Sequence, residues 1–190
     1  MKINYKEIKT KSNLLSLLRL FLAIPFWFLL DNFKYDAVRY ITFALCIFGS
    51  ITDIFDGYLA RKYNQVTEMG KIIDPLADKV AIGVIIIKLY LIGEINSTYF
   101  LLIIGRDILI FIGGIIVTRI VGKVLPSNVL GKIAVVNIGL VILLIILNVN
   151  RNFLVFKGFY YLSILLVFVS FIAYVYRAIE FIKKKNYGTL

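Results

Sequence analysis

The sequence predicts an all-α integral membrane protein with six transmembrane helices, a short N-terminal interfacial helix and both termini in the cytoplasm. Two observations lead to this fold class. Of the 190 residues, 61% are hydrophobic, whereas a soluble domain of this length is nearer to half apolar. The apolar residues also fall into separate runs, each close to the roughly 20 residues that a helix needs to cross the hydrocarbon core of a bilayer.

The predicted spans account for nearly the whole chain. The first is apolar apart from Ser16 and Arg19, and because no small-residue cleavage site follows it, we expect a retained span rather than a removed signal peptide. Residues 1–12 alternate Lys with Ile and Tyr, which is typical of an interfacial helix. No soluble domain or long linker remains, so residues 1–190 are predicted to form a single membrane domain. The six spans are residues 14–30, 38–61, 70–92, 99–117, 129–147 and 160–181.

Basic residues are distributed unevenly between these spans. The chain has 22 Lys and Arg against 11 Asp and Glu, a formal net charge of +11. Lys and Arg collect in cytoplasmic loops, and this bias predicts a multi-pass protein of the cytoplasmic membrane with both termini inside. Nucleic-acid binding is disfavoured because the basic residues lie between apolar spans instead of on one soluble face. The inner basic residues are Lys2, Lys6, Lys9, Lys11, Arg61, Lys62, Arg119, Lys123, Lys183, Lys184 and Lys185; the outer ones are Lys34, Arg39, Arg151 and Lys157.

The residue types that are present restrict the chemistry. The sequence has no histidine, which excludes imidazole acid–base catalysis and histidine metal ligands. Cys46 is the single cysteine, so an intrachain disulfide and a thiolate metal site are excluded as well. Any reaction must therefore use carboxylates, Lys, Arg, hydroxyl groups or metal ions.

Four aspartates lie in or at the edge of two consecutive predicted spans. Asp53 and Asp56 are three residues apart, and Asp74 and Asp78 are four apart, so each pair shares one face of its helix. Asp53 and Asp78 lie at matching depth, each about 12 Å from the inner end of its helix. If the two helices face each other, the four carboxylates form one oxygen-rich cage that opens towards the cytoplasm.

Carboxylates in a bilayer are expensive, so they are candidates for a functional site. Four of them would repel one another without cations, which indicates a bound metal, and all-oxygen ligation suits Mg²⁺, Mn²⁺ or Ca²⁺. The small residues Gly57, Ala60 and Gly70 would let a ligand approach closely, and Arg61 is a candidate clamp for a diphosphate. The pattern favours phosphoryl transfer, with metal on the diphosphate and one carboxylate deprotonating the attacking hydroxyl. The alternative is that the acids are structural partners of Arg61, Lys71 and Lys79.

These residues carry a resemblance to a known family. The pattern Asp53-x2-Asp56-Gly57-x2-Ala60-Arg61-x8-Gly70-x3-Asp74-x3-Asp78 resembles the complete signature of the CDP-alcohol phosphatidyltransferases. The resemblance implies a six-span fold and a metal-dependent transferase of phospholipid biosynthesis that works near the cytoplasmic face, commonly as a homodimer. The implied cofactor is Mg²⁺ or Mn²⁺, with two ions bound.

The resemblance also implies a role for each residue of the signature. Asp53, Asp56 and Asp74 match metal ligands of the family, with Asp78 completing the cage and matching the general base. The CDP part of the donor would be held by Asp56, Gly57, Ala60, Arg61, Gly70 and Asp74. The implied donor is CDP-diacylglycerol and the leaving group is CMP.

Within the family, the chain resembles the bacterial phosphatidylglycerolphosphate synthase group, which uses glycerol 3-phosphate as acceptor. The pattern Asn13-x2-Ser16-x2-Arg19 is similar to the opening of that group, and Gly105-Arg106-Asp107 and Leu130-Gly131-Lys132 are similar to two later elements. The residues expected to bind the acceptor are Arg106 and Lys132, from these two elements, together with Arg119. Ala134 and Val135 depart from the pattern, since a second Lys and a Thr would stand there.

Several alternatives stay open. Arg106 and Asp107 form either a structural pair or part of an acceptor-phosphate site, Lys132 could extend its amine to the interface, and Arg119 could be an ordinary inner-loop charge. The departures at Ala134 and Val135 keep open a CDP-amino-alcohol phosphotransferase with a lipid acceptor. A small cation channel or transporter is a third class. Gly113 and Gly114 are expected to be helix-packing positions.

Overall fold

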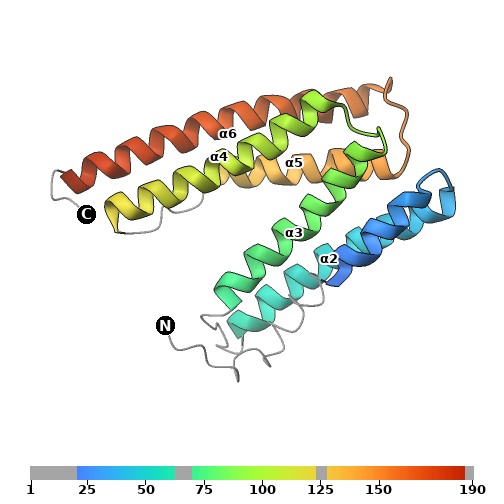
Figure 1. Ribbon diagram of the computed structural model, residues 1–190, viewed down its shortest axis with the longest axis horizontal. Coiled ribbons are helices and arrows are strands. Elements are labelled where there is room, and N and C mark those ends of the chain that lie inside the picture. Colours follow the sequence, from blue (N-terminus) through green and yellow to red (C-terminus); the bar gives the residue numbers. More distant parts are fainter. Residues whose placement is uncertain (1–20, 63–69, 123–127, 187–190) are drawn as a thin grey trace. The chain divides into compact units, whose positions relative to one another are not determined.

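A computed structural model of the protein describes residues 21–62, 70–122 and 128–186, apart from the side chains of residues 53, 54, 56–62, 70–78 and 186. The described residues are mostly helical and include no strand (Figure 1). An apolar helical stretch, Phe21–Asn32, ends in the 3-10 turn η2 (Leu30–Asn32). It is followed by α2 (Asp36–Lys62), α3 (Gly70–Leu91), α4 (Ser97–Val121), α5 (Val129–Ile146) and α6 (Leu154–Asn186). The predicted interfacial helix at residues 1–12 lies outside the described residues.

Among the described helices, three are long and apolar enough to cross a membrane: Ser97–Val121, Val129–Ile146 and Leu154–Lys185. They agree with the last three spans that the sequence predicts and indicate a membrane protein. The helices α2 and α3 cover the second and third predicted spans. The total of six spans and the side on which the termini lie stay predictions.

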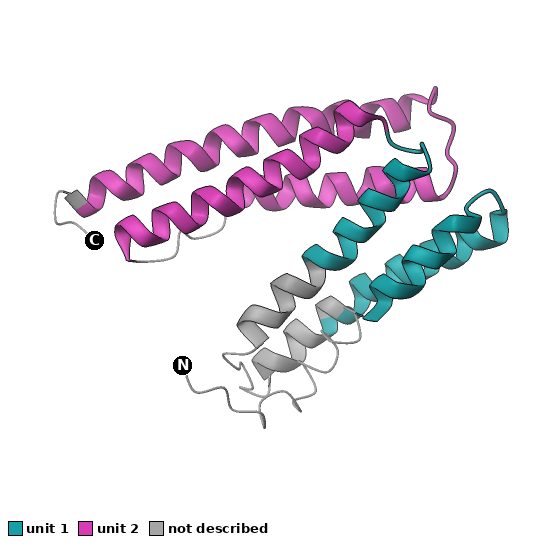
Figure 2. Cartoon of the chain, viewed as in Figure 1, with its two compact units in different colours: residues 1–95 teal, residues 96–190 magenta. Residues whose placement is uncertain are grey.

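The chain divides into two compact units, residues 1–95 and 96–190 (Figure 2). The first unit contains the helical residues 21–32, α2 and α3. Its apolar core is formed by Ala23, Phe26, Leu30, Phe33, Ala81, Ile85, Ile86, Leu89 and Ile95.

Two ion pairs join the elements of the first unit. Lys88 of α3 donates to Asp31 over 2.5 Å and lies 4.4 Å from the ring centre of Trp27. Arg39 of α2 donates to Glu94 over 2.9 Å, and its guanidinium lies 4.0 Å from the ring centre of Phe33. Lys88 and Arg39 are both buried, whereas the side chains of Asp31 and Glu94 are 53% and 22% exposed, so each pair joins a buried cation to an acid that reaches the surface of the unit.

In the second unit, α4 and α6 run parallel and α5 runs against them, as the ribbon in Figure 1 shows. The direction follows from three contacts: Tyr99 with Ser163, Arg106 with Ser170, and Lys185 with the carbonyl of Ile120. Both partners advance along the chain together, which is possible only for parallel helices. The core is mainly the buried face of α5: Ala134, Ile138, Val141, Ile142, Ile145 and Ile146.

The glycines Gly113 and Gly114 are packing positions, as the sequence predicts. A Cβ atom on Gly114 would lie 3.0 Å from Oη of Tyr174 on α6, and one on Gly113 would lie 3.3 Å from Cε1 of the same ring. The two glycines therefore make room for an aromatic ring between α4 and α6.

Candidate active site

The acidic motif lies on two consecutive helices of the first unit. Asp53 and Asp56 belong to the C-terminal part of α2, and Asp74 and Asp78 to the first turns of α3. The predicted helical setting of both pairs is confirmed. Their side chains lie outside the described part of the structure, so the predicted cage of four carboxylates stays a prediction. Among the residues that are described, no group of three or more potential metal ligands occurs.

The other signature residues occupy the same helix ends. Gly57, Ala60 and Arg61 follow Asp56 on α2, and Gly70 is the first residue of α3. Just before the motif, the hydroxyl of Thr52 donates to the carbonyl of Gly49 over 2.8 Å. Such back-bonding bends helices slightly. The opening pattern Asn13, Ser16 and Arg19 lies outside the described residues.

The chemistry of the four aspartates can be compared with the metal ions that the resemblance implies. Helix spacing of three and four residues puts each pair of acids on one face of α2 or α3. Four carboxylates without histidine or cysteine form an all-oxygen set, which fits Mg²⁺ or Mn²⁺ and not a softer metal. The residues present therefore fit the expected ions.

The second unit carries the three basic residues that the sequence predicts for the acceptor. Lys132 and Arg119 are exposed, near the N-terminus of α5 and the C-terminus of α4. Arg106 is different, since only 8% of its surface is exposed. Its guanidinium donates through Nη1 to Asp107 over 2.6 Å and through Nη2 to Ser170 of α6 over 3.1 Å. The pairing of Arg106 with Asp107, one of the two alternatives that the sequence leaves open, is thus present in the structure, while the acceptor-phosphate role is untested.

The buried guanidinium lies against the first turn of α5. A Cβ atom on Gly131 would come within 3.2 Å of Nη2 of Arg106, so the glycine lets the arginine approach this helix closely. The Nε atom of Arg106 is buried and has no hydrogen-bond partner within the described part of the chain. A buried donor without an acceptor is costly, and this one lies beside a helix N-terminus, where anions bind readily.

Sequence reasoning assigned no function to Ser170 or to Asn128, the N-cap residue of α5. For Ser170, the sequence contains one indication of a polar contact. Ser163 and Ser170 interrupt an apolar span at the interval of one heptad, which places them on the same side of α6. For Asn128, position before a hydrophobic run predicts the cap but not any further contact.

Comparisons with known proteins agree with the motif. A model of the CDP-alcohol phosphatidyltransferase family matches residues 9–176, and the chain belongs to this family. It is 42% identical over 88 residues to a CDP-diacylglycerol–glycerol-3-phosphate 3-phosphatidyltransferase of Rickettsia bellii, which covers 46% of this chain and 49% of the relative. It is 40% identical over 111 residues to the protein of that name from Aquifex aeolicus, covering 56% of this chain and 59% of the relative.

A third relative is a probable phosphatidylglycerophosphate synthase of Mycobacterium tuberculosis. It is 39% identical over 106 residues, which cover 54% of this chain and 50% of the relative. The aligned part of the chain thus spans about half the length of the curated relatives it matches. The predicted resemblance to this family, and to its members that use glycerol 3-phosphate, is confirmed at the level of similarity.

Proposed function

We propose that this protein is a membrane enzyme that transfers the phosphatidyl group of CDP-diacylglycerol to the hydroxyl of glycerol 3-phosphate and releases CMP. The observation that carries the proposal is the complete acidic signature at the adjoining ends of α2 and α3, in a chain that the family model matches over residues 9–176. The names of the relatives support glycerol 3-phosphate as the acceptor. The reaction would serve phospholipid biosynthesis.

The proposed setting is the cytoplasmic membrane, with six spans, both termini inside and the site near the inner face. Excess Lys and Arg in the inner segments supports this orientation. The C-terminal ends of α4 and α6 lie together, since Lys185 donates to the carbonyl of Ile120, and both ends carry the basic residues expected on the inner side. The proposed assembly, as in the family, is a homodimer.

In the donor site, Asp53, Asp56, Asp74 and Asp78 would hold Mg²⁺ or Mn²⁺, with two ions bound. When bound, the ions would offset the negative charge of the diphosphate and the charge that develops on it. Gly57, Ala60 and Gly70 would let the CDP moiety lie close to the helix backbones, with Asp56 and Asp74 also facing it. The guanidinium of Arg61 would bind diphosphate oxygens through its planar fork.

The transfer itself requires one proton acceptor and one bond exchange. Asp78 would take the proton of the acceptor hydroxyl. The hydroxyl oxygen then bonds to the phosphorus that carries diacylglycerol, the bond from this phosphorus to the bridging oxygen breaks, and the electron pair leaves with CMP. On the acceptor side, Arg106, Lys132 and Arg119 would bind the phosphate of glycerol 3-phosphate.

A second candidate function keeps the fold and changes the substrates: transfer from a CDP-amino-alcohol to a lipid hydroxyl. It is favoured by the two departures from the glycerol 3-phosphate pattern. Because the residues are alanine and valine, neither position offers the amine or hydroxyl that the pattern has there. Ala134 is fully buried in α5 and Val135 is 42% exposed. A cation channel is disfavoured by membership in a transferase family.

The test is CMP release by the purified protein with CDP-diacylglycerol, Mg²⁺ or Mn²⁺ and a panel of acceptors that begins with glycerol 3-phosphate. We expect metal-dependent release with that acceptor, and at least about a 100-fold loss in Asp78→Asn because the general base is removed. The matched control is Asp36→Asn, which changes an exposed aspartate in the first turn of α2 and should keep its activity.

Each of the other outcomes would support a different function or a different role for Asp78. Release from CDP-choline or CDP-ethanolamine with a diacylglycerol acceptor, but not from CDP-diacylglycerol, would move the protein to the second candidate. Full activity in a folded Asp78→Asn protein would show that Asp78 is not the general base. Metal flux into proteoliposomes without any CMP release would indicate a channel.

A further inference from the structure

The helices α4 and α5 both begin at an asparagine N-cap, and the two caps differ in one respect. Asn96 accepts a hydrogen bond from the backbone N–H of Tyr99 through Oδ1 over 2.8 Å. Asn128 accepts one from the backbone N–H of Leu130 through Oδ1 over 3.1 Å. In both, the side-chain oxygen Oδ1 accepts the capping hydrogen bond, and aspartate or serine would cap about equally well. What asparagine adds is an NH₂ group with two donor hydrogens.

At Asn96 this NH₂ group has an acceptor, because Nδ2 donates to Oη of Tyr160 over 3.2 Å. At Asn128 it has none among the residues that the structure describes: Nδ2 is buried there without a hydrogen-bond partner. A buried donor that lacks an acceptor destabilises a fold, and such a group calls for an explanation such as a missing ligand.

Arg106, the second residue here with a buried donor that lacks a partner among the described residues, lies on the other side of Gly131 from Asn128. The glycine Gly131 is flanked by both residues, since a Cβ atom there would lie 3.2 Å from Nη2 of Arg106 and 4.0 Å from Cβ of Asn128. Nε of Arg106 is also buried without a partner, and its residue is only 8% exposed. The start of α5 adds backbone N–H groups that have no intrahelical acceptor, together with the positive end of the helix dipole.

We propose that Asn128 and Arg106 together bind one oxyanion at the first turn of α5, with the Asn128 amide donating directly to it. The inference rests on the proposed function and identifies the anion with the phosphate of the acceptor. The chemistry selects a phosphate because it offers several acceptor oxygens, and the two buried groups here that lack a partner among the described residues, Nδ2 of Asn128 and Nε of Arg106, are both donors. Asp107 and Ser170 accept hydrogen bonds from Nη1 and Nη2 of the guanidinium, which leaves Nε available to donate to the ligand.

The experiment uses three variants of the full-length protein in detergent. Asn128→Ser keeps a cap and removes the amide donor. Asn128→Asp keeps a cap and places a negative charge at the anion. The matched control, Asn96→Asp, puts the same charge at the other asparagine cap. Because serine and aspartate are good N-cap residues, all three should unfold near the temperature of the wild-type protein when no ligand is added.

Two readouts are compared: the rise in unfolding temperature with glycerol 3-phosphate or with inorganic phosphate, and the KM for glycerol 3-phosphate in CMP release. Ligands that bind only the folded state raise its stability by mass action. We expect apparent affinity to fall roughly tenfold in Asn128→Ser and further in Asn128→Asp, because hydrogen bonds to charged groups are strong. Asn96→Asp should stay within about twofold of wild type.

Failure of this inference can be told from failure of the proposed function. An active wild-type protein whose KM and phosphate-dependent stabilisation are unchanged in both Asn128 variants would overturn the anion role of Asn128 alone. A wild-type protein that gains no stability from either phosphate compound would also overturn it. Absence of CMP release, with phosphate stabilisation that the Asn128 variants lose, would overturn the proposed reaction and leave the anion site supported.

Discussion

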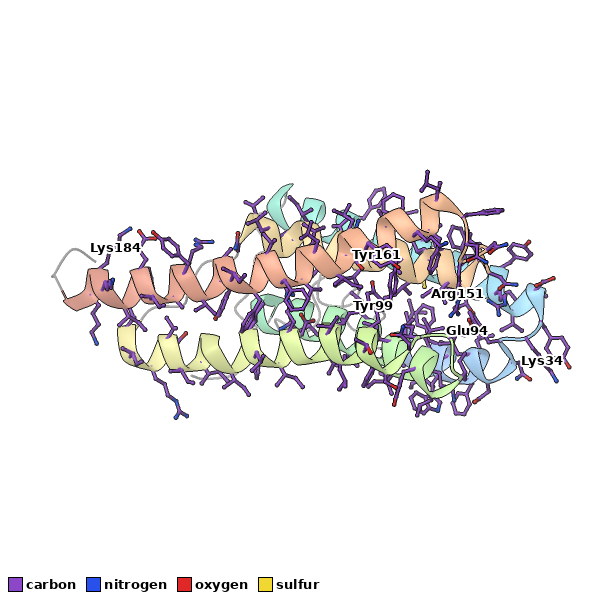
Figure 3. The ribbon with its side chains drawn as sticks, turned by 90° about the horizontal axis from the view of Figure 1, so that it is seen from above. Lys34, Glu94, Tyr99, Arg151, Tyr161 and Lys184 are labelled. Carbon is purple, nitrogen blue, oxygen red and sulfur yellow. The ribbon has the colours of Figure 1, made fainter. Side chains whose placement is uncertain are left out.

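Two polar layers between α4 and α6 have the same geometry and different chemistry. Tyr99 meets Ser163 and Arg106 meets Ser170, with a sequence separation of 64 residues in both pairs. In the first layer, which Figure 3 shows at Tyr99 between the two helices, the hydroxyl groups lie 2.7 Å apart, and Ser163 donates to the carbonyl of Tyr160 over 2.6 Å. In the second layer, Ser170 is bonded in the same manner to Val167, but the arginine keeps one donor without an acceptor.

The difference separates a contact that holds helices together from one that is available to a ligand. Tyr99 is 1% exposed and its hydroxyl is satisfied within the protein, so that layer is complete without any substrate. Arg106 is also buried, with 8% of its surface exposed, yet no described residue accepts a hydrogen bond from its Nε. A repeat of one heptad along α4 and α6 thus yields a structural layer and, one heptad further on, a candidate binding layer.

The largest effect is expected when the guanidinium of the second layer is removed. Arg106→Met removes the guanidinium and keeps an apolar side chain of similar reach, and we expect kcat/KM for glycerol 3-phosphate to fall at least about 100-fold, since truncating a buried, hydrogen-bonded charge costs about 2–5 kcal/mol. Tyr99→Phe, the matching change in the first layer, should leave kcat/KM within about threefold. Steady-state CMP release measures both. Equal losses in the two variants would show that the layers share one structural role.

A smaller effect compares the two serines. Ser170→Ala should raise the KM for glycerol 3-phosphate about three- to tenfold, because the guanidinium loses one of the two groups that hold it. Ser163→Ala should leave that KM unchanged and lower the free energy of unfolding by about 1–3 kcal/mol, because the buried hydroxyl of Tyr99 loses its acceptor. Chemical denaturation in detergent gives the second quantity. The comparison fails if Ser163→Ala changes the KM as much as Ser170→Ala does.

The smallest effect concerns the apolar contact farther along the same two helices. Gly114→Ala should lower the stability by up to about 1 kcal/mol because the new methyl group meets Oη of Tyr174 at 3.0 Å. Tyr174→Phe removes that oxygen and should relieve the loss, which a double-mutant cycle would detect as a favourable coupling. Gly105→Ala, where no atom lies within 4 Å of the new Cβ, should not destabilise the protein. Additive effects of the first two changes would contradict the contact.

The helices of the second unit could be predicted from hydropathy, but their ends could not. The predicted span 160–181 is part of a longer helix, Leu154–Asn186. Hydropathy marks where the hydrocarbon ends, whereas a helix can continue into water. Here Glu180 and Lys184 pair over 2.7 Å on the helix surface at the i,i+4 spacing, which supports a helix outside the membrane.

The acidic motif could be found from spacing alone, because helical periodicity fixes which residues share a face. The polar contacts between helices could not. Arg39 counts in the sequence only as an outer basic residue, yet it is buried and bonded to Glu94, 55 residues later in the chain. The free donor of Asn128 was hidden for the same reason, since only the packing of α5 against its neighbours decides which amide group finds an acceptor.

The unequal lengths of α4, α5 and α6 have a consequence for the surrounding lipid. These helices have 25, 18 and 33 residues, or about 38, 27 and 50 Å at the usual rise per residue. A hydrocarbon core is about 30 Å thick, so α5 is slightly too short and α6 far too long for it. Mismatch of this kind is relieved by thinning of the bilayer around the short helix and by projection or tilt of the long one. We therefore expect the thickness of the host membrane to influence how deeply the first turn of α5 sits below the water.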